Sequence, residues 1–215
     1  MTVPMMFEDR KGYAIAERMA AEAIASIDPE LAVAERAVTF DPEVGVFTIP
    51  FLGTNVFVSF PEGVVSGEDE RRLSGAAAIL ALHYLVYHGE PLQKEGWLAY
   101  RDMPGARHFM SAFEDMAEKR VSDYFGDEPG QMIRAAAALG GRPSDTGDVS
   151  FEIPAFPRVP LLVVLWGACE GVEGSARILF KPSASFYFHS EDLAALGAVT
   201  AERLIAVHKF RGDDV

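Results

Sequence analysis

The sequence predicts an α+β fold, a mostly antiparallel sheet packed against several helices in a single domain, residues 1–215. Three observations support this prediction. Strand-like segments precede a block of helices, and further strands and a terminal helix follow, unlike the regular alternation of a doubly wound sheet. Apolar residues make up 49% of a chain of 215 residues, which is enough for one sizeable core. No Ser/Gly tract, Pro-rich spacer or charge block divides the chain into two domains.

The first part of the chain is predicted to form one helix and a meander of strands. Apolar residues at three- and four-residue spacing predict a helix over 12–27, which Asp28-Pro29 ends. Segments rich in Val, Phe, Thr and Ile then predict antiparallel strands with a first turn at 41–45. These strands are expected over 33–40, 44–50 and 55–60.

The middle of the chain is predicted to be helical. Ser66 as an N-cap, with Asp69 three residues later, predicts a helix that continues to Gly89. This helix is apolar on nearly all sides, so we expect it to be buried in the centre of the domain. A loop or short strand with aromatic residues follows at 96–103. Two more helices are expected over 107–125 and 129–138, the second with Gly140 as its C-cap.

The last part is predicted to return to the sheet and to end in a helix. The run 161–166 is too apolar for an edge strand, so we expect it in the middle of the sheet. Ser190 is the expected N-cap of the final helix, with a break at Gly197. The other strands of this part are expected over 149–153, 177–180 and 185–188.

Charge and composition argue against several classes of partner. A net charge of −13, with basic runs no longer than pairs, predicts no binding to nucleic acid or to anionic lipid. The first eleven residues include Glu8 and Asp9, where an export signal would be apolar. The most apolar stretches are shorter than the ~20 residues that cross a bilayer. One cysteine, Cys169, allows no internal disulfide and fits a reducing compartment, so a cytoplasmic location is expected.

Two groups of side chains are candidates for a site. His83 lies in the most apolar helix, where its ring nitrogens need partners, and Tyr87 follows one turn later. His83 is either a core histidine bonded to a tyrosine hydroxyl or a carbonyl, or a site residue. His189, Glu191 and Asp192 form the second group, which is suited to a metal or to acid–base work. The same residues also match an ordinary helix start.

A third candidate is the aromatic segment Trp97 to Arg101, which contains Tyr100 and could form the wall of a ligand site with a charged anchor. A structural ion pair between Arg101 and Asp102 is the alternative. The large enzyme classes are disfavoured, because the chain has no Gly-rich phosphate loop, no dinucleotide fingerprint, no Gly-x-Ser-x-Gly elbow and no His-Glu-x-x-His. The residues alone therefore assign no metal and no cofactor.

Short motifs distributed over most of the chain carry a resemblance to a known family. They are Phe51-Leu52-Gly53, LALHYL at 80–85, Gly96-Trp97 with Tyr100-Arg101, PLLVVLW at 160–166 and ILFKPSASFYFHSED at 178–192. In these motifs, from about residue 14 to residue 197, the chain resembles an uncharacterised domain-of-unknown-function family of anaerobic bacteria and archaea.

The resemblance implies a role by association, since some members are linked to an iron–sulfur module like that of corrinoid proteins. Members of that family tend to have an Asp at the position of Lys181, and often a second His near Phe186. The resemblance supports His83, His189, Glu191 and Asp192 as the residues where the family pattern is kept.

Three functions remain open at this point. The first is a binding module for a small molecule or cofactor, such as a corrinoid or haem, that serves as an accessory protein in anaerobic redox or corrinoid metabolism. The second is a metal-assisted or acid–base enzyme in which His83 meets His189 with Glu191 or Asp192. The third is a structural subunit of a protein complex. The missing catalytic signatures favour binding over catalysis.

Overall fold

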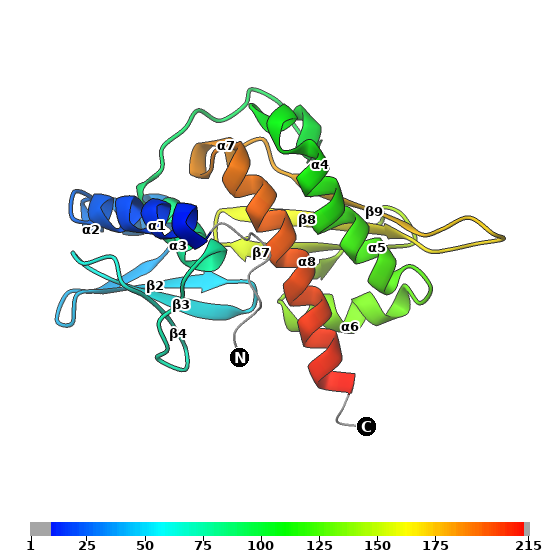
Figure 1. The fold of residues 1–215 in the computed structure, drawn as a ribbon, viewed down its shortest axis with the longest axis horizontal. Coiled ribbons are helices and arrows are strands. Elements are labelled where there is room, and N and C mark those ends of the chain that lie inside the picture. The colour runs from blue at the N-terminus through cyan, green and yellow to red at the C-terminus, as the bar shows by residue number, and fades with distance from the viewer. Residues whose placement is uncertain (1–9, 213–215) are drawn as a thin grey trace.

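The strands form two antiparallel sheets with helices packed around them in a computed structural model, which describes residues 10–212 (Figure 1). One sheet has the order β1-β2-β3-β4 and the other β5-β9-β8-β7-β6. The predicted α+β class is therefore confirmed. The expectation about an export signal concerns residues 1–11, of which 1–9 lie outside the described residues.

The first sheet and the two helices before it account for the beginning of the chain. The strand predicted over 33–40 is wrong for 33–36, which are the end of α2 (Pro29–Arg36), and only 39 and 40 belong to a strand. The Asp28 carboxylate accepts hydrogen bonds from the amides of Glu30 and Leu31, so Asp28-Pro29 begins the second helix, whereas the first helix already ends at Ile24, before the predicted end at 27. The elements are α1 (Arg10–Ile24), α2 (Pro29–Arg36), β1 (Thr39–Asp41), β2 (Val46–Phe51), β3 (Thr54–Ser59) and β4 (Val65–Gly67).

The predicted meander is confirmed in β1, β2 and β3. Its first turn is closed by the Gly45 amide, which donates to the Asp41 carbonyl over 2.8 Å. Between β2 and β3 the chain turns at Gly53, where φ is +77 and an added Cβ would lie 2.9 Å from the Ala138 carbonyl oxygen. Glycine therefore lets the hairpin pack directly against the end of a helix.

The buried central helix is α3 (Ala76–Val86), which begins later than predicted. Ser66 lies in β4, and the Asp69 carboxylate accepts from the Arg71 amide in the following turn, so neither residue caps the helix. A Ser with an acidic residue three positions later occurs in turns as well as in caps, which explains the error. The prediction that this helix is central and buried is correct, since Leu80 and Leu82 are fully buried.

The helices over 107–125 and 129–138 are confirmed, with one irregularity. The first contains a π-helical turn at Glu114–Glu118, which brings the Glu118 carboxylate to β9. There Glu118 accepts from the Ile178 amide, beside the end of the two-residue strand β5. The elements of this part are β5 (Leu98–Ala99), short 3-10 turns at Tyr100–Asp102 and Ala106–His108, α4 (Met110–Phe113), α5 (Lys119–Phe125) and α6 (Gly130–Ala138).

The second sheet contains β8 in its middle, as its apolar sequence predicted. A strand over 185–188 was the wrong prediction, because the chain forms one helical turn that is closed by the Phe188 amide donating to the Ala184 carbonyl. The predicted break at Gly197 is also absent from the helix described over Ser190–Gly212. The elements are β6 (Arg142–Pro143), β7 (Val149–Phe156), β8 (Val159–Trp166), β9 (Ser175–Phe180), α7 (Ala184–Tyr187) and α8 (Ser190–Gly212).

One hydrophobic cluster extends across both sheets and the helices that cover them. Figure 1 shows α8 crossing the face of the second sheet beside α4 and α5. The packing also brings α3 into contact with α8, although the two helices are far apart in the sequence. Among the described residues, no helix is both long enough and apolar enough to cross a membrane.

Candidate metal centre

His83 is the polar exception on the apolar helix α3. Its neighbours in the sequence, Leu82 and Tyr84, are fully buried, whereas the His83 side chain is 21% exposed. The helix therefore presents the imidazole at the border of the core, where the ring can contact both protein and solvent.

His189 and Asp192 lie at the start of α8. The Asp192 side chain is only 5% exposed, and the His189 side chain is 39% exposed. Asp192 lies in the first turn of the helix, where the unpaired amides and the helix dipole favour a negative charge. This location lowers the cost of burying a carboxylate beside the core.

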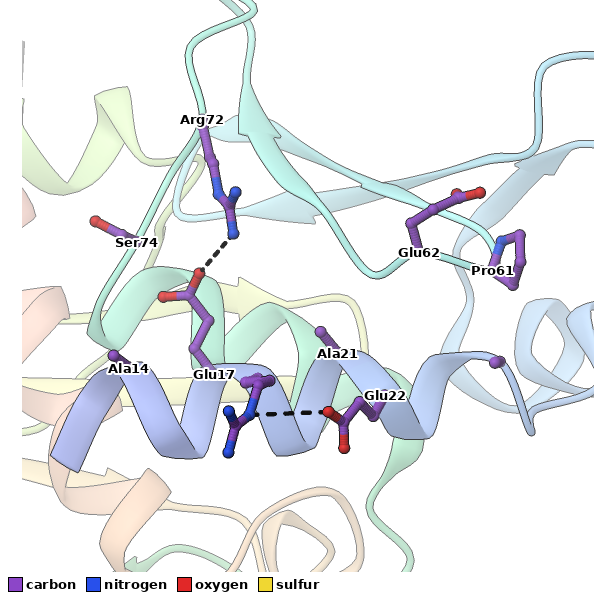
Figure 2. A pocket seen from close by; sticks show the side chains of 10 residues that line it. Ala14, Glu17, Ala21, Glu22, Pro61, Glu62, Arg72 and Ser74 are labelled. Atoms are coloured by element: carbon purple, nitrogen blue, oxygen red, sulfur yellow. Dashed lines mark hydrogen bonds and ion pairs between the residues drawn. The ribbon is translucent and has the colours of Figure 1, made fainter. Parts of the chain in front are cut away.

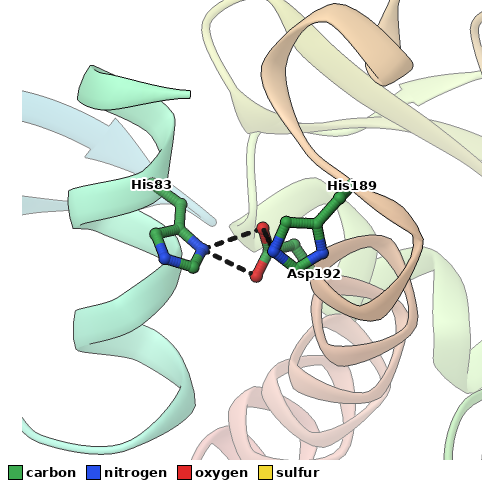
Figure 3. A group of neighbouring side chains, drawn as sticks. All are labelled: His83, His189 and Asp192. Carbon is green, nitrogen blue, oxygen red and sulfur yellow. Dashed lines mark hydrogen bonds and ion pairs between the residues drawn. The ribbon is translucent and has the colours of Figure 1, made fainter. Parts of the chain in front are cut away.

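The three side chains meet between the two helices (Figure 3). Both Asp192 oxygens lie 2.9 Å from His83 Nδ1, and Oδ2 lies 3.1 Å from His189 Nε2. The imidazole rings are 5.4 Å apart between centroids. A carboxylate only accepts hydrogen bonds, so in the absence of another ligand the facing ring nitrogens would carry protons. Among the residues that the structure describes, the partner of His83 Nδ1 is thus a carboxylate, and neither a tyrosine hydroxyl nor a carbonyl.

The same arrangement has the composition of a metal site. One donor atom from each of the three residues can be chosen so that all lie within 4.8 Å of one another. Metal–nitrogen and metal–oxygen bonds of about 2.0–2.2 Å place neighbouring donor atoms roughly 3 Å apart, close to the distances at Asp192. Two histidines and one carboxylate leave further coordination positions open to water or a ligand.

Tyr87 borders this group, as its spacing from His83 suggested. Its ring meets the His189 ring edge-on, with 5.6 Å between centroids. Tyr87 is the C-cap residue of α3 and is half-buried. Both His83 and Tyr87 therefore contact His189 from the same end of the helix.

The segment Trp97 to Arg101 is divided between different surroundings. Lys181 Nζ lies 3.9 Å from the centre of the Trp97 ring. The buried Tyr100 hydroxyl donates to the Ser190 carbonyl over 2.9 Å, which ties this segment to the start of α8. Burial raises the pKa of Tyr100, so its hydroxyl remains a donor at neutral pH. Arg101 and Tyr100 line a separate small cavity of about 80 Å³ with Glu118 and Arg177.

Glu191 is exposed, and it is not among the three residues that meet at the centre. Of the two acidic side chains in the first turn of α8, only Asp192 contacts the histidines. The candidate group from the sequence is reduced to His83, His189 and Asp192, with Tyr87 at its border.

A larger hollow lies elsewhere on the molecule (Figure 2). It has a volume of about 760 Å³ and lies between α1 and the segment 61–74. Its lining is formed by alanines and by charged residues that partly pair with each other, such as Arg72 with Glu17 at 3.5 Å. The histidines and Asp192 are not part of this lining.

Sequence reasoning missed Arg36, the last residue of α2, which is fully buried beside Tyr87 and α7. Arg36 Nη2 donates to the Tyr87 carbonyl over 2.7 Å. The segment around Arg36 was predicted as a strand, and no local pattern indicated a buried cation there.

A comparison with family models decides the family. The model of the domain of unknown function DUF3786 matches residues 28–203. The chain belongs to this family. Neither a search of curated proteins nor a search of solved structures found a match. The DUF3786 region contains His83, His189 and Asp192 as well as Arg36, and it agrees with the resemblance described for residues 14–197 except at its ends.

Proposed function

We propose that this DUF3786 protein binds a divalent transition-metal ion through His83, His189 and Asp192, and acts as a cofactor-binding protein. The observation that carries the proposal is the position of the Asp192 carboxylate, 2.9 Å from one imidazole nitrogen and 3.1 Å from the other. The three donors come from α3, from the first turn of α8 and from the residue before α8, and they need little movement to surround one ion.

The chemistry of the donors limits the choice of ion. Imidazole nitrogens suit zinc, iron, cobalt, nickel and copper, and a single carboxylate is compatible with each of them. Mg²⁺ and Ca²⁺ prefer sets of oxygen ligands, so they fit this group less well. A bound ion would supply a Lewis acid, or a redox centre in the case of iron, with positions open for a further ligand.

The family resemblance supports a narrower role as an accessory protein in anaerobic redox or corrinoid metabolism. Two positions depart from the resembled pattern, Lys181 and Phe186. Lys181 lies over the Trp97 ring, and Phe186 packs against Arg36 and His88. Neither position supplies one of the three donors, which supports an intact centre in this chain.

The first experiment is native mass spectrometry of the protein purified without oxygen, followed by titration of the metal-stripped protein with Co²⁺. We expect a mass increase of one metal ion and visible absorption bands on Co²⁺ binding. Asp192→Asn should weaken Co²⁺ binding at least tenfold, because the charged ligand is lost. His108→Ala is the matched control, since His108 is exposed on a short turn and should leave the titration unchanged.

Two outcomes would change the conclusion. Equal Co²⁺ affinity in wild type, Asp192→Asn and His108→Ala would place any metal elsewhere and end the proposal. A retained mass matching a corrinoid or haem would replace the bare ion by the metal of a tetrapyrrole. Trp97→Ala and His83→Ala would then be tested for loss of that cofactor.

A second candidate is a metal-assisted or acid–base enzyme. The observation in its favour is that Asp192 holds His83 by Nδ1 while both imidazoles remain partly exposed. A histidine oriented in this way is a common general base. Hydrolysis of p-nitrophenyl acetate and p-nitrophenyl phosphate, measured with and without Zn²⁺, tests it. Identical rates in wild type and in the His83→Ala variant would count against catalysis of this class.

A further inference from the structure

We infer that Arg36 is a positioning residue, whose buried guanidinium holds the segments that carry His83 and His189 in register around Asp192. The consequence for metal affinity rests on the proposed function. The geometric part of the inference concerns the hydrogen bonds of the two histidines and can be tested without metal.

Arg36 first holds the end of α3. Its Nη2 donates to the Tyr87 carbonyl over 2.7 Å, one turn after His83. The backbone carbonyl of Arg36 accepts from the Tyr84 hydroxyl over 2.6 Å. Arg36 is therefore hydrogen-bonded to both ends of the segment 84–87. This segment follows His83 directly, and the ring of its last residue, Tyr87, contacts His189.

Arg36 also holds the turn that leads into α8. Its guanidinium carbon lies 5.0 Å from the ring centres of Phe186 and Tyr187. His189 follows Tyr187 by two residues. The Gly89 amide donates to the Phe186 carbonyl over 2.9 Å, so the two segments are also joined directly. One side chain thus contacts both chain segments that deliver the histidines.

A purely structural role fits Arg36 poorly. The side chain is fully buried, and among the described residues its Nε and Nη1 have no hydrogen-bond partner. Desolvation lowers the pKa of Arg36, which reflects the unfavourable burial of its charge. Burying a charge is costly unless the charge is paired, so packing alone would be served as well by Met. What Met cannot reproduce is the directed bond to the Tyr87 carbonyl together with the cation–aromatic contacts.

The test compares Arg36→Met and Arg36→Lys with wild type and with Val58→Ala. Val58 is a buried residue of β3 and serves as a control for a general loss of stability. For each metal-free protein, thermal unfolding and the NMR signals of the imidazole N–H protons of His83 and His189 are recorded. Co²⁺ titration follows on the same samples.

We expect Arg36→Met to keep a melting temperature at or above that of Val58→Ala, while the His189 ring proton exchanges faster with water. Co²⁺ binding should weaken by about 10–100-fold, as for residues that orient metal ligands. Val58→Ala should keep both the ring-proton signals and the affinity. If Arg36→Met does not fold, the ring-proton signals and the Co²⁺ affinity are measured on Arg36→Lys instead. Lys keeps the charge but lacks the planar group, so the same changes are expected.

Unchanged ring-proton signals in the folded Arg36 variant would overturn the inference, and so would changes equal to those in Val58→Ala. If wild type binds no Co²⁺, but the Arg36 variant still loses the protected ring protons that wild type has, only the proposed metal function is refuted. The positioning role would then stand.

Discussion

The buried side chain of Tyr84 joins distant parts of the chain through its hydroxyl. Its hydroxyl donates to the Arg36 carbonyl over 2.6 Å and accepts from the Arg158 amide over 3.1 Å. The ring is fully buried and stacks on Phe156 with 4.5 Å between centroids. The hydroxyl therefore connects α2, α3 and the turn between β7 and β8.

Removing this hydroxyl should cost stability. We expect Tyr84→Phe to lower the free energy of unfolding by roughly 1–3 kcal/mol, because the buried Arg36 carbonyl and the partly buried Arg158 amide lose a partner. Urea unfolding followed by circular dichroism measures the change. Tyr124→Phe is the comparison, since its half-buried hydroxyl lies 3.0 Å from His208 Nδ1 and its loss should cost less. A Tyr84→Phe variant as stable as wild type would show that water replaces the hydroxyl.

The packing of α8 depends on Gly197, the residue at which the sequence predicted a break in the helix. A Cβ at Gly197 would lie 2.5 Å from Cε2 of Phe113 and 3.3 Å from the Ala117 methyl group. The missing side chain lets α8 approach α4 and the π-helical turn closely, so glycine at this position serves packing and does not end the helix.

Gly197 inside α8 and Gly130 at the start of α6 should respond oppositely to alanine. Alanine stabilises an unstrained helix interior by up to about 1 kcal/mol relative to glycine. At Gly197 we expect a net loss of about 1–3 kcal/mol, because the added methyl group overpacks against Phe113. At Gly130, where no atom lies within 4 Å of an added Cβ, the change should be neutral or stabilising. Thermal unfolding of both variants checks the signs, and a stabilised Gly197→Ala would contradict the close contact.

Two carboxyl groups, one buried and one partly buried, link the stability of the whole protein to pH. Burial raises the pKa of Glu118 and of Glu202 above the ordinary value of 4.5, although Arg177 and Arg120 act in the opposite direction. The folded protein therefore holds protons at a pH where the unfolded chain has released them. Their contribution to stability is fully present below the unfolded pKa and is lost as the pH rises through the folded pKa.

Lowering the pH from 7 toward 5 should therefore raise the melting temperature. Glu118→Gln removes one of the two groups, and we expect it to flatten this slope. Differential scanning calorimetry at constant ionic strength measures both proteins. Identical slopes for wild type and Glu118→Gln would mean that Glu118 does not contribute, and Glu202 and the general acidity of the chain, −13 at pH 7, would then be the remaining causes.

The three residues of the candidate centre could be recognised in the sequence, but which of the candidate residues lie together could not. His83, His189 and Asp192 each stood out in the sequence, because an imidazole in an apolar helix and carboxylates at a helix start are recognisable locally. Trp97 and Arg101 stood out as well, yet they belong to other surroundings. Arg36 gave no signal, since its burial depends on Phe186 and Tyr187, which are far away in the sequence.

Local sequence patterns were enough to predict the α+β class, the buried helix α3, the central strand β8 and the similarity to an uncharacterised family. These features follow from local periodicity, from turn residues and from motifs that are continuous in the chain. The helices at 29–36 and 184–187, and the contact of His83 with Asp192 over 109 residues of sequence, became known from the folded structure. Such a contact depends on the packing of α3 against α8, and no short stretch of sequence encodes the distance between two helices.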